Sequence, residues 1–158
     1  MTAFDEAKKM LDYVVARAFD GFTEGGPWNL PTRRYVTQGQ AVYDCEQVAA
    51  TMVALNTGLP AQVTPGGNMI ANCPPIWNLI VEVAIVRCHP TAGDDGTPPK
   101  VEKYNESAQK TAKDAEILMR AANSRADEMF GAVTATLQFP PPTDMTATVC
   151  RYTIALST

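Results

Sequence analysis

The side chains best suited to chemistry are the thiol of Cys45, the carboxylate of Asp44 beside it, and the imidazole of His89, which is the one histidine in the chain. A thiol near an imidazole can act as a nucleophile, with the imidazole as its base. Cys88 adjoins His89, but neighbours on a strand point to opposite faces and do not form a pair. Because an unpaired cysteine is more often a small buried apolar residue, the sequence favours packing over catalysis at Cys45.

The cysteines are spread singly along the chain, at Cys45, Cys73, Cys88 and Cys150. Zinc sites usually take ligands from closely spaced pairs, and this chain has no C-x-x-C motif. We therefore expect no metal site. Cys45, Cys88 and Cys150 are predicted to be buried thiols on strands, and a reducing compartment would keep them as thiols.

Two short patterns suggest binding, but each has a simpler interpretation. Arg33 and Arg34 could hold a phosphate or a carboxylate, although a surface pair that forms salt bridges is favoured. The G-D-D-G segment at 93–96 has the composition of a structural turn. The chain contains no Walker loop, H-E-x-x-H or G-x-S-x-G motif, so we expect no cofactor and no catalytic residue.

The totals describe an ordinary globular chain. A length of 158 residues fits one domain, 1–158, with a sizeable core. Thirteen basic residues against seventeen acidic ones give a net charge of -4, which argues against a nucleic-acid reader. The N-terminus lacks the apolar core of a signal peptide, and no apolar run approaches the roughly 18 residues of a membrane helix. We therefore expect a soluble protein made to stay in the cytosol.

The element around which the rest is arranged is residues 76–89, which have no helical period and are predicted to form a mid-sheet strand. One set of alternate residues is wholly apolar and should be covered by a helix: Trp77, Leu79, Val81, Val83 and Ile85. The other set has polar interruptions. Its face should be only partly dry, with Glu82 at a pore, a rim or a neighbouring subunit.

The N-terminal segment predicts a helix that covers the sheet. Thr2 and Asp5 form a T-x-x-D capping box for a helix that runs to about Phe19. Its apolar stripe is Phe4, Ala7, Leu11, Val14 and Ala18. After a glycine-rich turn, Trp28 is predicted to plug the core, with a contact surface as the alternative.

Strands are predicted at 32–37 and 43–55. Helix and strand compete over the second range, where the alternation of residues favours a strand. The loop that follows, 56–75, is rich in Gly and Pro, and a connection of this length is usually functional or mobile. A second loop covers 89–100.

The longest helix is predicted at 101 to about 129, after Pro98 and Pro99, with a kink near Asn123 or an overhang because of its length. An alanine-rich stripe should face the sheet: Ala108, Ala112, Ala115, Leu118, Met119, Ala122, Ala126 and Met129. Strands are predicted again at 133–139 and 146–156. This order predicts an α+β fold with a largely antiparallel sheet.

Five short motifs occur in a distinctive order: P-T-R-R-Y-V at 31–36, Y-D-C-E-Q at 43–47, L-P-A at 59–61, V-R-C-H-P at 86–90 and D-A-E-I-L-M-R at 114–120. In order and spacing they resemble the tail terminator proteins of long-tailed, siphovirus-type bacteriophages, particularly those of actinobacterial hosts. The resemblance covers most of the chain. The motifs carry no chemistry of their own.

The resemblance implies a mixed, largely antiparallel sheet flanked by the N-terminal helix and the long second helix. It implies a structural virion protein, not an enzyme, that forms a homo-oligomeric ring, typically a hexamer. Such a ring caps the tail tube, ends tail polymerisation and joins the tail to the connector or stopper protein of the head and neck. It is assembled in the host cytoplasm and resides at the tail-neck junction, with DNA passing through its lumen without specific binding.

The family fixes no interface by motif, so the loops are the candidates for contact. Val63, Met69 and Ile70 are predicted for a first interface, and His89, Asp94 and Asp95 for a second. Acidic groups, among them Glu82, should rim a lumen that must not hold DNA tightly. The alternatives are another neck or minor tail protein such as a head-to-tail stopper, a small cysteine hydrolase or transferase, and a monomeric cytosolic binding module.

Overall fold

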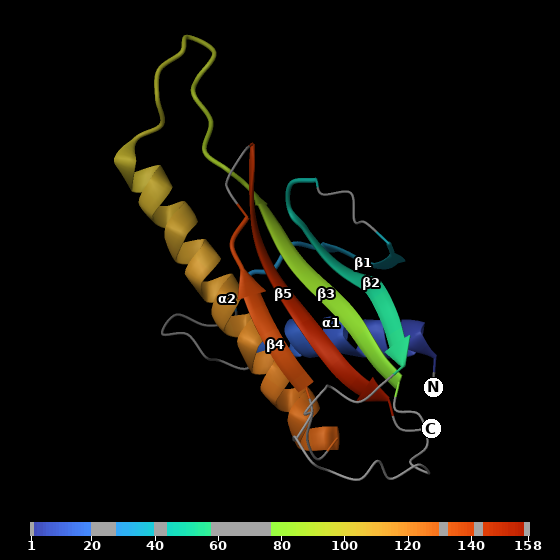
Figure 1. The fold of residues 1–158 in the computed structure, drawn as a ribbon. Coiled ribbons are helices and arrows are strands. Elements are labelled where there is room, and N and C mark those ends of the chain that lie inside the picture. Colours follow the sequence, from blue (N-terminus) through green and yellow to red (C-terminus); the bar gives the residue numbers. More distant parts are fainter. Residues whose placement is uncertain are drawn as a thin grey trace, which may run out of the picture.

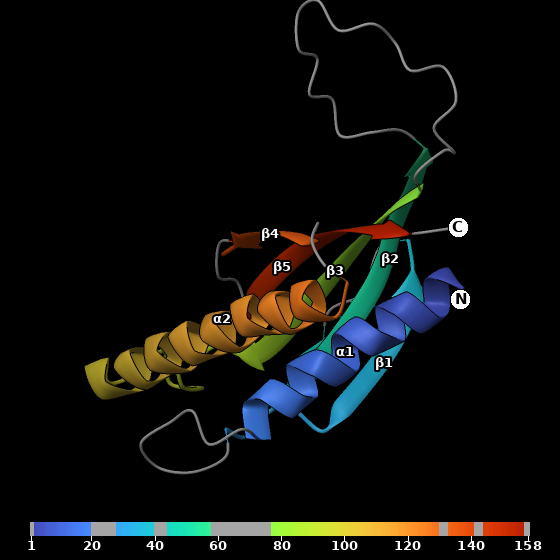
Figure 2. The ribbon, with the colours of Figure 1, turned by 90° about the horizontal axis from the view of Figure 1, so that it is seen from below.

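Both helices of the described chain lie on one face of a single sheet, as Figure 2 shows. The computed structural model describes residues 2–19, 28–39, 44–57, 77–129, 133–140 and 144–156, with the backbone alone at 57, 125–129 and 133. In chain order the elements are α1 (Ala3–Phe19), β1 (Arg33–Gln38), β2 (Gln47–Thr57), β3 (Trp77–Cys88), α2 (Val101–Met129), β4 (Val133–Gln138) and β5 (Met145–Leu156). The fold is α+β, as predicted.

The sheet is mixed and mostly antiparallel, with the strand order β1-β2-β3-β5-β4 (Figure 1). β1 pairs with β2 in parallel, and the three other pairs are antiparallel. The stretch at 76–89 is confirmed as the central strand, with a neighbour on each side. The choice of strand over helix for 43–55 is also confirmed, although β2 starts at Gln47. Its ladder to β3 is interrupted by a register shift between Met52 and Ala54.

The helix-covered face of the sheet holds the main core. The apolar alternate set of β3 points into it, with Leu79, Val81, Val83 and Ile85 all buried. The strand residues packed beside them are Val48, Ala50, Cys150, Tyr152 and Ile154, and the helix residues are Ala7, Met10, Leu11, Val14, Ala18, Ile117, Leu118, Ala121 and Ala122. The prediction that this set is covered by helix is therefore confirmed for these four residues, whereas Trp77, at the start of β3, is only half-buried.

The capping box at the start of α1 is confirmed. The Thr2 backbone N–H donates to Asp5 Oδ2 at 2.8 Å, and the Asp5 backbone N–H donates to Thr2 Oγ1 at 3.2 Å. The prediction for Phe4 was wrong, because its side chain is 50% exposed. The buried stripe is centred on Met10 and Val14, which leaves Phe4 at its margin in the first turn.

The bounds of α2 are as predicted, but the predicted stripe was wrong at three positions, and the side chains of Ala126 and Met129 lie outside the described residues. Ala108 and Ala112 are exposed, and Met119 is 41% exposed. Burial begins at Asp114 and continues through Ala115, Ile117, Leu118, Ala121 and Ala122. Figure 2 gives the reason, since the N-terminal part of α2 extends past the strands, where no sheet lies beneath it. Of the two outcomes predicted from the length of this helix, a kink or an overhang, the structure shows the overhang.

The cysteines follow the prediction only in part. Cys150 is fully buried on β5, as expected. Cys45 is only partly buried and lies in a bend before β2, while Cys88 ends β3 and is exposed. The prediction of buried thiols was wrong for these two residues, because both lie where the β2–β3 pair runs out.

Candidate functional site

The residues predicted for the two interfaces have different outcomes. Val63, Met69 and Ile70 lie outside the described residues. His89, Asp94 and Asp95 all lie in the segment between β3 and α2, but the structure places them in two distinct settings.

Asp94 and Asp95 lie in an exposed turn, which confirms the structural interpretation of the G-D-D-G segment. The Gly96 N–H donates to the Gly93 carbonyl at 2.8 Å, and the Thr97 N–H donates to Asp95 Oδ1 at 2.9 Å. Hydrogen bonds from Thr97 hold the pKa of Asp95 below its usual value. Gly96 has a φ of 76°, a left-handed conformation that glycine adopts without strain. Both side chains remain exposed to partners.

His89 belongs to a packed corner between β5 and α2. Its backbone N–H donates to the Asp144 carbonyl at 3.0 Å, and its ring lies 5.7 Å from that of Tyr104. Its Nδ1 atom is buried and has no hydrogen-bond partner among the described residues. The imidazole is therefore held by packing.

The thiol of Cys45 is paired with another thiol. A hydrogen bond with Cys88, partial burial, and the nearby carboxylates of Asp44 and Glu46 raise the pKa of Cys45 to about 11. Because the thiolate is the nucleophilic form, this shift opposes catalysis near neutral pH. Asp44 Oδ1 accepts from the Cys45 N–H at 2.8 Å, so this carboxylate orients the backbone.

The two arginines of β1 also have structural partners. Arg33 Nη1 lies 2.8 Å from Asp44 Oδ2, so the predicted surface salt bridge is confirmed there. Arg34 instead donates from Nε to the Pro31 carbonyl at 3.0 Å, so the ion-pair prediction was wrong for Arg34. Neither residue is arranged with the other as an anion clamp.

A buried ion pair that the sequence analysis missed joins β3 to α2. Arg87 Nε donates to Asp114 Oδ2 at 2.6 Å, and Arg87 Nη2 donates to Asp114 Oδ1 at 2.8 Å. The two side chains are 10% and 1% exposed. Burial lowers the pKa of Arg87, but hydrogen bonding and attraction by Asp114, with help from Glu46, raise it overall. The pair is therefore a bidentate, charge-assisted link between β3 and α2.

The segment before β1 is fastened to the same ion pair. Trp28 Nε1 donates to Asp114 Oδ1 at 2.9 Å, Arg87 Nη2 donates to the Asn29 carbonyl at 3.1 Å, and the guanidinium lies 5.5 Å from the Trp28 ring centre. Trp28 is partly buried and packs against the main core, so its prediction as a plug is confirmed in part. A sequence signal existed, because Arg87 continues the apolar alternate set of β3 and a charge there needs a partner.

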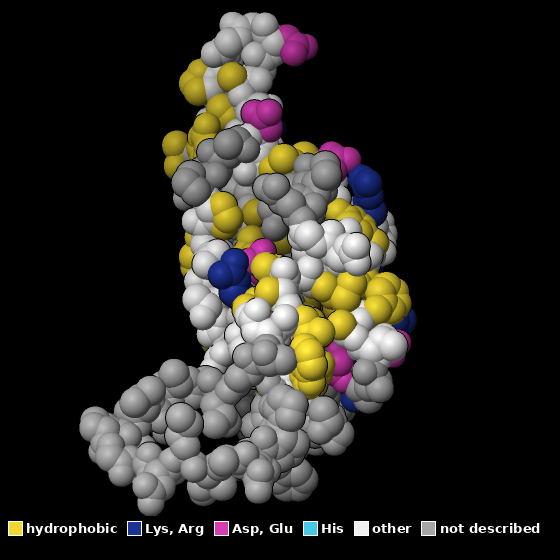
Figure 3. All heavy atoms as spheres, turned by 45° about the vertical axis from the view of Figure 1, so that its right-hand side comes forward, with side chains coloured by type: hydrophobic (Ala, Val, Ile, Leu, Met, Phe, Trp, Pro, Cys, Tyr) yellow, Lys and Arg dark blue, Asp and Glu magenta, His cyan; other side chains and the backbone are white. Residues whose placement is uncertain are grey.

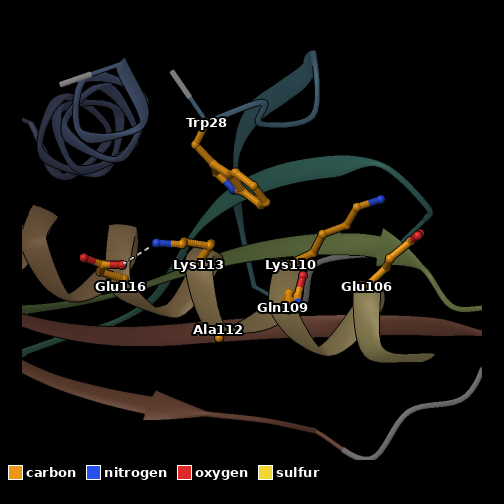
Figure 4. A pocket seen from close by; sticks show the side chains of 7 residues that line it. All are labelled: Trp28, Glu106, Gln109, Lys110, Ala112, Lys113 and Glu116. Carbon is orange, nitrogen blue, oxygen red and sulfur yellow. Dashed lines mark ion pairs between the residues drawn. The ribbon is translucent and has the colours of Figure 1, made fainter. Parts of the chain in front are cut away.

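Two hollows flank this ion pair. Figure 4 shows Trp28 over one of about 500 Å³, whose other wall comes from α2: Glu106, Gln109, Lys110, Ala112, Lys113 and Glu116. A second hollow, of about 260 Å³, lies where Arg87 and His89 approach the N-terminal half of α2. Its lining mixes Lys and Glu side chains, so no single ligand charge is selected.

The face of the sheet away from the helices is the other candidate surface. It carries a small apolar cluster of Ala84, Val86 and Val149. Glu82 accepts from Arg151 Nε at 2.8 Å across the β3–β5 pair, so this carboxylate has a partner within its own sheet. Figure 3 shows mostly apolar and uncharged side chains on the described part of the visible surface, with separate charged groups.

Among the described residues, no cluster of three or more His, Cys, Asp or Glu side chains could hold a metal ion. In the same part of the chain, no helix is long and apolar enough to cross a membrane. Neither a protein-family model nor a curated protein matches the sequence.

Proposed function

We propose that the protein is a structural virion protein of the tail-terminator type, which forms a ring on the end of a phage tail tube and joins the tail to the neck. The resemblance of the five motifs supplies the family. The proposal rests on the two edge strands of the sheet, β1 and β4, whose outer sides are unpaired within the described chain.

The edges are matched in length and opposite in direction. β1 and β4 are the outer strands, each has six residues, and within the described chain neither pairs along its outer side. β1 runs with β2, and three antiparallel pairings then separate β2 from β4, so β4 runs opposite to β1. In copies related by rotation about an axis along the strands, β4 of one would meet β1 of the next as an antiparallel pair.

This contact is heterologous, because two different surfaces meet. Heterologous contacts close into rings when the rotation between copies divides a full turn. Closure would also cover the unpaired N–H and C=O groups of both edges, which otherwise favour uncontrolled association.

The position of the helices favours one orientation within such a ring. Both helices lie on the same face of the sheet (Figure 2), and this bulkier layer fits the outer circumference. The opposite face would then surround the lumen. Phosphate contacts bind DNA in a salt-dependent manner, so a lumen with few free cations lets DNA pass. Arg151, which would face the lumen, is paired with Glu82.

The test is the mass of the purified protein by light scattering over a concentration series, with negative-stain imaging in the presence and absence of tail tubes. We expect a monomer that becomes a ring with a central hole and that caps tube ends. Thr134→Lys, which adds a cation on β4, should weaken the ring. Gln109→Lys, on exposed helix far from β4 in the sequence, is the matched control. A strict monomer that ignores tubes would contradict the proposal.

A further inference from the structure

Cys45 and Cys88 face each other across the end of the β2–β3 pair. The last paired residues of that ladder are Gln47 and Val86, and each cysteine lies two positions further out. Beyond the last paired residues, the Cys88 backbone N–H donates to the side-chain Oε1 of Glu46 at 3.3 Å, so the two segments remain in contact there. The Cys88 thiol lies close enough to Cys45 to raise the pKa of the Cys45 thiol.

We propose that Cys45 and Cys88 are a built disulfide site, in which the two thiols are oxidised to an intramolecular bond when the protein meets a disulfide oxidant. Gln47 and Val86 are directly opposed, which puts their Cα atoms about 4.5–5.5 Å apart and brings the two chains together within the range that disulfides span. Glu46 has a φ of 57° and bends the chain between Cys45 and β2, so the bond requires adjustment of this bend and of the side chains while the paired strands stay in place. Cys150 is fully buried on the helix-covered face and is not part of the site.

The reaction balances with oxidised glutathione as the oxidant. The exposed Cys88 thiolate attacks one sulfur of glutathione disulfide, which forms a mixed disulfide and releases one glutathione thiolate. The Cys45 thiolate then attacks the sulfur of Cys88 and displaces the second glutathione. The two protons of the protein thiols end on the two glutathiones, and the protein loses two hydrogens and two electrons.

The surroundings make the second step slow at neutral pH and faster in alkali. Until Cys88 has reacted, its thiol, burial, and the carboxylates of Asp44 and Glu46 raise the pKa of Cys45 to about 11. In the mixed disulfide the Cys88 thiol no longer contributes, but burial and the two carboxylates still raise this pKa, so the Cys45 thiolate is the minor form at neutral pH. The pair therefore remains reduced in a reducing compartment and closes on prolonged exposure to an oxidising one.

A closed bond would tie the start of β2 to the end of β3, directly beside the Arg87 ion pair. It would restrict the unfolded chain over the segment between the two cysteines, and the folded state would be stabilised accordingly. The inference stands on the β2–β3 register and does not rest on the proposed function, so the bond should form in monomers as well as in rings.

The experiment incubates the native protein with oxidised glutathione at pH 8, alkylates the free thiols, and digests it with trypsin and a protease that cuts after glutamate. Cleavage after Glu46 separates Cys45 from Cys73, which would otherwise share a tryptic peptide. We expect a linked pair of peptides covering 35–46 and 88–100, which dithiothreitol separates. The thermal midpoint of the oxidised protein should rise by about 5–10 °C.

The controls are single variants. Cys45→Ser and Cys88→Ser should each abolish the linked pair, while Cys150→Ala should retain it. Glutathione retained on Cys88 without a link to Cys45, or a link from either cysteine to Cys73, would overturn the proposal. Because the readout is a peptide mass and not ring assembly, failure here is distinct from failure of the tail-terminator proposal.

Discussion

The two faces of the sheet are built from the same five strands but have opposite chemistry. The helix-covered face is packed with apolar side chains beneath α1 and α2, and the buried Arg87–Asp114 ion pair links this face to α2. The other face has a small apolar cluster and an ion pair that is only partly buried. The covered face therefore carries most of the packing that stabilises the fold, and under the proposed function the open face and the two sheet edges would make the contacts of assembly.

The largest expected effect comes from the buried carboxylate. Asp114→Asn removes the buried counter-ion of Arg87 and leaves it only the more exposed carboxylate of Glu46, 3.7 Å from Nη1. We expect a loss of about 3–5 kcal/mol in the free energy of unfolding, measured by urea denaturation. Glu116→Gln is the matched control, because Glu116 lies on the same helix and pairs with the exposed Arg120 at 2.6 Å. Its expected loss is below about 1 kcal/mol. Equal losses in the two variants would mean that the buried ion pair stabilises the fold no more than the surface pair does.

Apolar packing should show the same contrast along α2. Leu118 is fully buried, whereas its neighbour Met119 is 41% exposed. Leu118→Ala should cost about 2–5 kcal/mol through lost transfer energy and a cavity. Met119→Ala should change stability by no more than about 0.5 kcal/mol. Thermal unfolding of both variants measures this, and a costly Met119→Ala would mean that the exposed side of α2 is covered.

Because Tyr152 is buried, the free energy of unfolding should depend on pH in the alkaline range. Its hydroxyl donates to the Leu118 carbonyl at 2.7 Å, and burial, with Cys150 nearby, raises the pKa of the phenol well above 10. The unfolded chain then loses this proton first, so stability is present below about pH 10 and declines as the pH rises above it. Tyr152→Phe should cost about 1 kcal/mol at pH 7 and flatten that decline. A decline of unchanged slope in the variant would contradict the account.

The smallest effect is expected on the open face. A double-mutant cycle of Glu82→Gln and Arg151→Gln should give a coupling below about 1 kcal/mol, because the two side chains are 19% and 45% exposed. The coupling is measured from urea midpoints at low protein concentration. A coupling comparable to the loss for Asp114→Asn would show that the open face also fixes the fold.

The sequence alone predicted those elements whose pattern lies within a few neighbouring residues. The alternation in 76–89 predicted β3 and its covered face, Thr2 and Asp5 predicted the start of α1, and Pro98 and Pro99 preceded the start of α2. These features depend on neighbours within a few residues, so they can be recognised without knowing the fold.

The sequence was insufficient where two distant segments meet. The side of α2 that is buried depends on where the sheet ends, which the helical period does not encode. The contact between Arg87 and Asp114 spans 27 residues, and the facing of Cys45 and Cys88 requires the β2–β3 register. Of the three predicted interface residues that the structure describes, His89 is packed into a corner by contacts with Tyr104 and Asp144, which are distant in the sequence.

The most direct test of the central claim is amide hydrogen exchange followed by mass spectrometry at low and high protein concentration. If the chain closes into a ring through its sheet edges, peptides that cover β1 and β4 should become protected as the concentration rises. Peptides from the overhanging part of α2 should not change. Ring formation with unchanged exchange in β1 and β4 would contradict edge pairing, and unchanged exchange and mass at every concentration would contradict the ring itself.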